Sequence, residues 1–387
     1  MTAGLTIGIY YPFEPYVGGG ELFTFAIAEH LSRTHSVELL TAGAERVPGI
    51  AASMGCDLSR VRLRPRTGYI KPLEKALGSN RYDLFVCVSN HAAPPLASLG
   101  KRGLLVVQFP FPTRRGDWLR TGLLGPLMLR SYHLAVVYSR FVAKWLKLRS
   151  PRRIETRVLA PPVETLDGSA DAPRDKVILG VGRFFEGQHS KRHDVLVEAF
   201  RGLVDGGLEG WELHLAGSAR PEPEHKAYLA RVRALAAGYP VVIHTDIARA
   251  DLHALYRRAS VFWHATGYGT DEQAHPEAME HFGIVTVEAM SAGCVPVVIA
   301  RGGQPEIVQH GVSGFLWSTL DELKALTLQY ASSDEAAKRA YRTEAIEASQ
   351  RYSTRNFRAN LDDIVRYVMG QRDLVAGHAG PEQLTPG

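Results

Sequence analysis

The sequence predicts two α/β domains, each a doubly wound parallel sheet covered by helices on both faces. Three observations support this fold class. The chain has 387 residues, of which 45% are hydrophobic, and this is enough for two separate cores. Short apolar runs alternate with helical patterns along most of its length, as parallel sheets covered on both faces require. The alternation is interrupted at residues 160–175 by a stretch rich in Pro, Ala, Asp and Gly, and then restarts.

The expected elements follow in chain order. Candidate strands of the first half are 5–11, 36–41, 61–65, 83–89, 104–109 and 134–139, with helical patterns such as 21–33 and 139–148 between them. Strands of the second half are expected at 176–184, 211–217, 241–247, 261–265, 295–300 and 314–317, followed by helical sequence over 319–369. Ligands bind at the carboxyl ends of the strands in such sheets. We therefore expect the two domains to face each other across a cleft that holds the functional site.

The composition excludes several classes of protein. No run of about 18 apolar residues exists, so no membrane-spanning helix is predicted. The amino terminus enters a strand-like run without a basic segment, so no signal peptide is expected. The three cysteines are scattered and lack metal-ligand spacing, which favours reduced thiols in a cytoplasmic protein. Residues 371–387 are expected to form a disordered polar tail.

The positive charge is concentrated in one segment. Residues 101–153 contain twelve Lys and Arg residues and a single acidic residue, Asp117, whereas the whole chain has a net charge of +5. Trp and Leu are interleaved with these cations, and this mixture suits contact with an anionic membrane or an anionic acceptor. The alternative is an ordinary solvated surface. Nucleic acid is not an expected partner, because no known binding module is present.

Two glutamates eight positions apart mark the candidate site. Glu280 and Glu288 flank the turn "HFGI", and a helix is expected to begin near Gly283. Exposed N–H groups at a helix N-terminus attract an anion, and the carboxylates beside it can accept hydrogen bonds from hydroxyls. The helix is otherwise almost wholly apolar, so a carboxylate at Glu288 requires a dedicated partner. The alternative is that Glu280 only caps the helix and Glu288 lies on its surface.

Two cations are expected at the same edge of the sheet. Arg183 follows the strand "KVILGV", and Lys191 is expected to open the next helix. Fixed positive charge here can stabilise a departing diphosphate, because arginine binds phosphate through a fork of N–H groups and lysine acts as a compact charge. The alternative is that both cations are merely solvated.

Four segments together carry a family resemblance: "EHFGIVTVEAMSAG", "GVGRF" with "KRHDVLVEAF", "RGGQPEIVQHGVSGFLW" and "RYSTRNFRANLDDIV". They resemble the retaining glycosyltransferases of family 4, which have the GT-B fold and an E-x7-E motif. The resemblance covers nearly the whole chain. It implies an acceptor-side domain over 1–160, a linker over 161–175, a nucleotide-sugar-binding domain over 176–350, and a helix over 351–370 that returns to the first domain.

The resemblance also implies roles for individual residues. Glu280 would hydrogen-bond hydroxyls of the donor sugar, and Glu288 would bind the ribose hydroxyls. Arg183 and Lys191 would hold the diphosphate. The nucleotide-sugar site would further include Phe282, Gly283 and Ile284 of the motif and Gly18, Gly19 and Gly20, which precede a helix of the first domain.

One position departs from the family pattern. Many members have a histidine where this sequence has Gln108, in "VVQFPFP". Glutamine can hydrogen-bond a sugar hydroxyl, but it cannot take up a proton as histidine does. His91, in "VSNHAAP", is a candidate substitute, although a single histidine after a strand is more often structural.

The expected function is transfer of a hexose from a nucleotide-sugar to a hydroxyl acceptor, with retention of the anomeric configuration. The acceptor would be lipid-linked, a glycan or a small molecule, and the pathway polysaccharide, glycolipid or glycoconjugate biosynthesis. No D-x-D or H-E-x-x-H sequence is present, so neither a metal nor a cofactor is expected. The protein would be cytoplasmic or peripheral on the inner face of the plasma membrane. The alternatives are an epimerase or phosphorylase of the same fold, or a non-catalytic membrane-surface protein.

Overall fold

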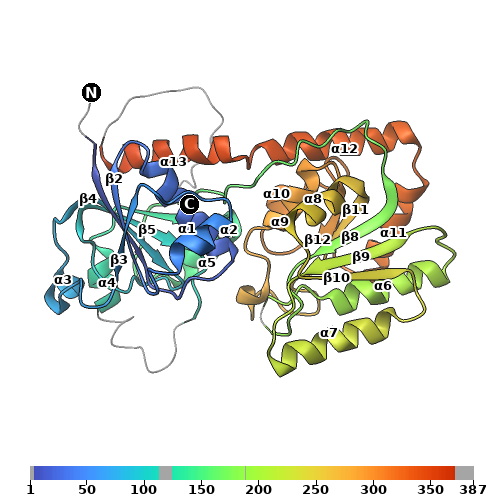
Figure 1. The fold of residues 1–387 in the computed structure, drawn as a ribbon, viewed down its shortest axis with the longest axis horizontal. Helices are drawn as coiled ribbons and strands as arrows, with labels where there is room; N and C mark the ends of the chain where they lie inside the picture. Colours follow the sequence, from blue (N-terminus) through green and yellow to red (C-terminus); the bar gives the residue numbers. More distant parts are fainter. Residues whose placement is uncertain (1–3, 113–123, 188, 371–387) are drawn as a thin grey trace. The chain divides into compact units, whose positions relative to one another are not determined.

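The structure is a computed structural model that describes residues 4–112, 124–187 and 189–370 (Figure 1). The chain divides into two compact units. The first comprises Met1–Pro162 together with Thr354–Gly387, and the second comprises Val163–Ser353. The first unit is therefore assembled from two parts of the chain that are distant in the sequence.

A seven-stranded parallel sheet forms the centre of the first unit. Its order is β3-β2-β1-β4-β5-β6-β7, so the chain starts inside the sheet and winds outward in both directions. The strands are β1 (Thr6–Tyr11), β2 (Ser36–Thr41), β3 (Val61–Pro65), β4 (Tyr82–Ser89), β5 (Gly100–Val107), β6 (Leu134–Val137) and β7 (Thr156–Val158). Six of these strands were predicted. The seventh, β7, was not, because its three half-buried residues form no apolar run.

Helices connect these strands. They are α1 (Gly19–Leu31), α2 (Val47–Ser53), α3 (Pro72–Leu77), α4 (Gly125–Leu129) and α5 (Arg140–Arg149). The predicted helix over 139–148 corresponds to α5, which begins after Ser139, whose hydroxyl accepts a hydrogen bond from the Val142 N–H at 3.2 Å. The glycines at 18–20 do not all precede the first helix as predicted, because α1 already begins at Gly19.

The last helix, α13 (Thr354–Val368), completes the first unit. Its apolar face packs on α1, where the rings of Phe357 and Phe23 meet edge to face at 5.7 Å. Polar contacts surround this packing, since His30 Nε2 lies 2.7 Å from Asp362. Arg358 also pairs with Glu29, at 3.4 Å. A carboxyl-terminal helix over 351–370 was expected to return to the first domain, and α13 belongs to the first unit.

The second unit contains a six-stranded parallel sheet. Its order is β10-β9-β8-β11-β12-β13, and each strand corresponds to a predicted one. The strands are β8 (Asp175–Val181), β9 (Glu212–Gly217), β10 (Val241–Thr245), β11 (Ala259–His264), β12 (Val295–Ile299) and β13 (Phe315–Trp317). The order reverses between β8 and β11, so the loops after these two strands are adjacent at the carboxyl edge. Such a reversal is where doubly wound sheets bind ligands.

Helices cover both faces of this sheet (Figure 1). They are α6 (His193–Asp205), α7 (Pro223–Ala236), α8 (Arg249–Arg258), α9 (Ile284–Ser291), α10 (Gln304–Ile307), α11 (Leu320–Ser332) and α12 (Glu335–Gln350). On one face α6, α7 and α11 contribute to a core around Phe200, Trp263 and Trp317, which are fully buried. On the other face α9 packs against α12.

Part of the predicted linker is a packed segment of the second unit. The backbone N–H groups of Leu166 and Gly168 donate to the hydroxyl and the carbonyl of Ser291, at 3.1 and 2.9 Å. A side chain at Gly168 would collide with the backbone of Ala292 at the end of α9. The composition of 161–175 predicted an interdomain linker and gave no signal for this packing, because glycine serves flexible turns and close backbone approach alike.

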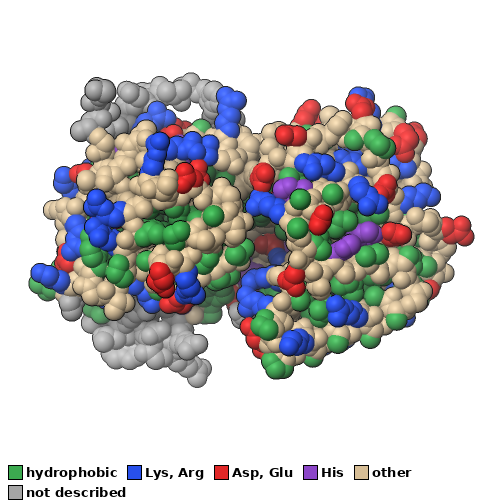
Figure 2. All heavy atoms as spheres, in the orientation of Figure 1, with side chains coloured by type: hydrophobic (Ala, Val, Ile, Leu, Met, Phe, Trp, Pro, Cys, Tyr) green, Lys and Arg blue, Asp and Glu red, His purple; other side chains and the backbone are tan. Residues whose placement is uncertain are grey.

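The structure also bears on the cysteines, on membrane-spanning helices and on the distribution of surface charge. All three cysteines are buried, and none of them forms a disulfide within the described residues. Within the described ranges, no helix is long and apolar enough to cross a membrane. The middle of the basic segment, 113–123, and the predicted tail, 371–387, lie outside the described residues. On the face drawn in Figure 2, Lys and Arg side chains are interspersed with Asp and Glu on both units.

Candidate active site

The carboxyl edge of the second sheet brings three predicted residues together. Arg183 follows β8 by two residues, Lys191 precedes α6, and Glu280 lies between β11 and α9. Lys191 does not open the helix as predicted. The helix begins at His193, because Arg192 at the N-cap adopts a left-handed conformation with φ of 52°.

Lys191 and His264 both bind the Glu280 carboxylate. The Lys191 ammonium forms an ion pair with Glu280 Oε2, and His264 Nε2 lies 3.1 Å from the same oxygen. The side chains of Lys191 and Glu280 are only 17% and 15% exposed, and His264 is 3% exposed. Although burial opposes ionisation of Glu280, the nearby ammonium and imidazole hold its pKa well below the usual value. Glu280 is therefore an ionised carboxylate in a nearly enclosed setting.

The backbone at Gly182 makes room for the Lys191 side chain. A Cβ atom at this position would overlap the Lys191 stem, so only glycine allows Lys191 to lie across the end of β8. Arg183 makes no hydrogen bond or ion pair with any residue that the structure describes. Its guanidinium stacks 5.1 Å from the centre of the Phe185 ring, and the side chain remains partly exposed. Arg183 is thus a partly solvated cation, whereas Lys191 is paired with Glu280.

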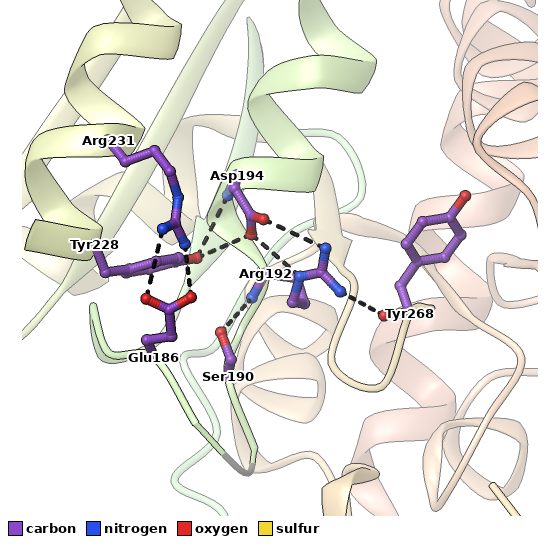
Figure 3. Close-up of polar contacts among 7 residues, drawn as sticks. All are labelled: Glu186, Ser190, Arg192, Asp194, Tyr228, Arg231 and Tyr268. Atoms are coloured by element: carbon purple, nitrogen blue, oxygen red, sulfur yellow. Dashed lines mark hydrogen bonds and ion pairs between the residues drawn. The ribbon is translucent and has the colours of Figure 1, made fainter. Parts of the chain in front are cut away.

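A polar network fixes the segment that carries Lys191 (Figure 3). The Arg192 guanidinium binds both oxygens of Asp194, at 3.2 and 3.3 Å, and donates to the carbonyl of Tyr268 at 2.5 Å. Tyr228 of α7 donates its hydroxyl to Asp194 at 3.1 Å. The network connects α6, α7 and the loop after β11, and the backbone N–H of Arg192 contacts the hydroxyl of Ser190 at 3.4 Å. The residues on either side of Lys191, Ser190 and Arg192, are therefore held by polar contacts.

Glu288 lies in the second turn of α9, as predicted. It is half-buried, and the fully buried Tyr256 donates its hydroxyl to Glu288 Oε2 at 3.0 Å. Burial raises the pKa of Glu288 to about 7, while the hydrogen bond from Tyr256 acts in the opposite direction. The carboxyl group thus has one dedicated partner within the described protein, and it titrates near neutrality.

The turn before α9 depends on glycine. Gly283, the N-cap of α9, has φ of 126°, which strongly favours glycine. The carbonyl of Glu280 accepts a hydrogen bond from the Gly303 N–H at 2.7 Å. Phe282 is buried and meets the ring of Tyr352 edge to face at 5.2 Å. Ile284, the first residue of α9, is partly exposed beside the helix N-terminus. Phe282 and Gly283 therefore shape the turn that fixes Glu280.

The first unit has a different set of groups at the carboxyl edge of its sheet. The Gln108 side chain lies over the glycine segment, since a Cβ atom at Gly20 would be 2.6 Å from Gln108 Nε2. His91 lies two residues after β4, and its Nδ1 contacts the carbonyl of Phe111 at 3.4 Å. Gln108 is thus the nearer of the two to the glycines 18–20. Its Nε2 has no hydrogen-bond partner within the described protein.

A buried carboxylate supports this glycine segment. Glu21, in the first turn of α1, is 1% exposed and accepts a hydrogen bond from the Tyr11 hydroxyl at 2.6 Å. The backbone N–H of Tyr16 also approaches it, at 3.4 Å. Burial, followed by the charge of Glu21, raises the pKa of Tyr11 far above its ordinary value.

Sequence reasoning missed Glu21, Arg192, Tyr256 and His264. His264 was visible as the last residue but one of the predicted strand 261–265, three strands along the chain after the strand that precedes Arg183, but one histidine forms no pattern. Arg192 follows Lys191 directly, and its left-handed backbone has no sequence signal. In the described ranges, no group of three or more His, Cys, Asp and Glu residues could hold a metal ion.

Part of the chain is similar in sequence to known proteins. Residues 165–347 match the family described as "Glycosyl transferases group 1". Two relatives named D-inositol 3-phosphate glycosyltransferase, from Mycobacterium sp. (strain KMS) and Mycobacterium marinum (strain ATCC BAA-535 / M), are each 33% identical. The matches span 150 and 158 residues, or 37% and 38% of this chain. They cover only 29% and 28% of the relatives' own lengths.

Solved structures match nearly the whole chain. A glycosyltransferase from Rickettsia africae ESF-5 is 16% identical with a TM-score of 0.73, over 95% of this chain and 100% of that one. Anabaena HepE, solved with UDP and glucose, is 18% identical with a TM-score of 0.68, over 94% and 100%. The pneumococcal O-GlcNAc transferase GtfA, solved with UDP and GlcNAc, is 12% identical with a TM-score of 0.65, over 95% and 99%. The chain has the GT-B fold.

The predicted GT-B fold is therefore confirmed, with one parallel α/β sheet in each unit. The family match falls within the second unit of this GT-B chain and includes Arg183, Lys191, Glu280 and Glu288. No part of the match extends to the first unit, where Gly18–Gly20, His91 and Gln108 lie. The family match therefore concerns the second unit.

Proposed function

We propose that the chain is a glycosyltransferase that moves a sugar from a nucleotide-sugar donor to a hydroxyl acceptor. One observation carries the proposal: Lys191 and Glu280 form a nearly enclosed pair at the carboxyl edge of a GT-B sheet, with Glu288 eight residues further on. This set offers positive charge to a diphosphate and carboxylate oxygens to sugar hydroxyls. It lies in the region that matches group 1 glycosyl transferases.

The proposed roles follow from charge and position. Arg183 is partly exposed and has no described polar partner, so it can turn its guanidinium to phosphate oxygens. Lys191 would supply the second charge, and together the two would stabilise the leaving diphosphate without a metal ion. Glu280 would accept hydrogen bonds from the sugar, and Glu288 from the ribose. Gly18–Gly20, Gln108 and His91 are proposed as the share of the first unit in binding donor or acceptor.

We further propose that the anomeric configuration is retained. The bond between the sugar C1 and the diphosphate oxygen breaks, and the acceptor oxygen bonds to C1 on the same face. The acceptor proton passes to the departing diphosphate, so no protein nucleophile is required. The proposed products serve polysaccharide, glycolipid or other glycoconjugate biosynthesis in the cytoplasm. Anabaena HepE, with UDP and glucose in its structure, makes a UDP-sugar a reasonable first donor to test.

A peripheral membrane contact is a second part of this proposal. Helix α5 exposes Lys144, Lys147 and the apolar Leu148, and Leu148 is 65% exposed. Arg152 and Arg153 are exposed just after it. Exposed cations beside an exposed leucine suit an anionic lipid surface or a lipid-linked acceptor. Arg114, Arg115 and Arg120 of the same basic segment lie outside the described residues.

The decisive experiment is a donor panel. UDP-, GDP- and ADP-sugars are titrated calorimetrically into the full chain, and slow hydrolysis of each is followed by chromatography. We expect micromolar to millimolar binding of one nucleotide series and hydrolysis unaffected by EDTA. NMR of the released sugar then reports the anomer formed first. Failure of every nucleotide-sugar to bind would rule out the proposed function, and an inverted anomer would rule out retention alone.

A further inference from the structure

The second unit contains a buried histidine whose position suggests a role in sugar recognition. His264 is the last residue of β11 and is 3% exposed. Its Nε2 lies 3.1 Å from Glu280 Oε2, and Thr266 Oγ1 lies 3.2 Å from the same nitrogen. A strand end is a rigid support, and the imidazole has few rotamers in so enclosed a space.

The protonation state of this pair follows from its chemistry. Glu280 is ionised, since its pKa is held well below the usual value, and an ionised carboxylate only accepts hydrogen bonds. His264 Nε2 must therefore carry the hydrogen that bridges to Glu280. Burial lowers the pKa of His264, so the ring is a neutral donor whose Nδ1 has no described partner.

The two oxygens of Glu280 are used unequally. Lys191 and His264 both bind Oε2, whereas no described residue donates a hydrogen bond to Oε1. The carboxylate is thus anchored through one oxygen, and the other is left to accept a hydrogen bond from a ligand. Oε1 keeps its orientation toward a ligand only while Oε2 is held by one of these two residues.

The two anchors differ in what they do when an anion arrives. Lys191 has a flexible four-carbon stem and a full charge, so a diphosphate competes with Glu280 for its ammonium. His264 is neutral, buried and at the end of a strand, so a diphosphate neither attracts it nor reaches it. Its hydrogen bond persists while Lys191 redistributes between Glu280 and phosphate.

We propose that His264 is a positioning residue that holds Glu280 Oε2 while Lys191 engages the diphosphate, so that Oε1 faces a hydroxyl of the donor sugar. The inference rests on the proposed function, because it assigns the sugar part of the donor to the Glu280 carboxylate. Binding of the sugar and binding of the diphosphate would then depend on different residues of one site. The sugar would depend on His264, and the nucleoside diphosphate would not.

The test compares sugar-containing and sugar-free ligands in matched variants. UDP, GDP and ADP, and their glucose conjugates, are titrated into the full-length wild type, His264→Gln, His264→Asn and His264→Ala. The glutamine amide nitrogen can reach the place of Nε2, whereas the shorter asparagine amide reaches only the place of Nδ1. We expect His264→Ala and His264→Asn to weaken nucleotide-glucose binding about tenfold to a hundredfold. Diphosphate affinity should stay within about twofold, and His264→Gln should recover most of the loss.

His214→Gln is the matched control for disturbance of a buried histidine. His214 is 7% exposed on β9, and its Nε2 contacts Glu212 at 2.9 Å, a pair similar in geometry but outside the site. We expect the His214→Gln variant to bind both ligand classes as the wild type does. Thermal unfolding of all variants shows whether each remains folded. The His264→Gln and His264→Asn variants differ by one methylene group, so they can be compared with each other even if His264→Ala unfolds.

The outcomes are distinct. Equal weakening of diphosphate and nucleotide-glucose would assign His264 to the fold alone and overturn the inference. Wild-type behaviour in His264→Asn would overturn it too, while leaving the proposed glycosyltransferase function intact. If the wild type bound no nucleotide-sugar at all, the proposed function would fail first, and this inference with it.

Discussion

Both units are parallel α/β sheets covered by helices, but different side chains lie at the carboxyl edges of the two sheets. In the second unit an ion pair between Lys191 and Glu280 lies beside the partly exposed Arg183. In the first unit the corresponding edge offers the uncharged amide of Gln108 together with the imidazole of His91, and Glu21 is buried beside the glycine segment.

The two edges therefore differ in where their charges lie: the second unit has a largely buried ion pair, and the first unit has an exposed one. The edge of the second unit can bind an anion, because Arg183 and the largely buried Lys191 both present positive charge there. At the edge of the first unit, Gln108 can exchange hydrogen bonds with neutral partners such as hydroxyls, and the charged residues Glu14 and Arg46, which follow β1 and β2, are exposed and paired with each other. The fold provides the position, and the residues after each strand determine the ligand.

The largest effect should come from the charged edge. We expect Lys191→Ala to lower turnover of a nucleotide-sugar a hundredfold or more, because a fixed charge on the leaving diphosphate is lost and Glu280 loses a partner. Steady-state kinetics with and without EDTA measure this. Lys176→Ala, at an exposed position near the start of β8, is the control and should be unaffected. Activity abolished by EDTA and restored by Mg²⁺ would show that a metal holds the diphosphate instead.

In the first unit, loss of the buried hydrogen bond between Tyr11 and Glu21 should lower stability. Tyr11→Phe removes the 2.6 Å hydrogen bond to the buried Glu21, so we expect the free energy of unfolding to fall by about 1–3 kcal/mol. Urea denaturation measures it. Tyr239→Phe removes an exposed hydrogen bond to Asp205 and should change stability by less than about 1 kcal/mol. Equal effects of the two substitutions would mean that burial of Glu21 adds nothing.

Glu288 should make nucleotide affinity depend on pH. Its pKa is raised to about 7, so in the free protein the carboxyl is mainly protonated at pH 6 and mainly ionised at pH 8. Only the ionised form accepts hydrogen bonds from two ribose hydroxyls, so affinity should rise about tenfold from pH 6 to pH 8 through this group. Glu288→Gln should remove this rise, while the part due to phosphate ionisation remains in both proteins. Identical pH profiles would contradict the assignment to ribose.

The smallest effect concerns the basic surface of the first unit. If α5 contacts anionic lipid, Lys147→Ser should weaken binding to anionic vesicles by about 1 kcal/mol, roughly fivefold, at moderate salt. Lys226→Ser, an exposed position on α7 of the second unit, is the control. Flotation with anionic and neutral vesicles decides the matter. Equal partitioning of the wild type into both vesicle types would remove the electrostatic explanation, and binding to neither would favour a soluble acceptor.

The sequence predicted the sheets well because both are central and largely buried, so their strands form continuous apolar runs. It also predicted that α9 begins near Gly283 and carries Glu288. It could not predict that Lys191 precedes its helix, since this depends on the backbone angles of Arg192. His264 was missed for another reason, because its hydrogen bond to Glu280 joins residues sixteen apart through a loop without a regular pattern.

The order in which the chain is synthesised gives α13 a further consequence. Translation delivers β1 before the second unit and α13 after it, so the first unit stays incomplete until the whole second unit has left the ribosome. Until then Phe23 lacks its contact with Phe357. The second unit is continuous from Val163 to Ser353 and has no such delay. The domain that is made first is therefore finished last, and a nascent chain must keep an apolar surface of α1 soluble through the synthesis of nearly two hundred further residues.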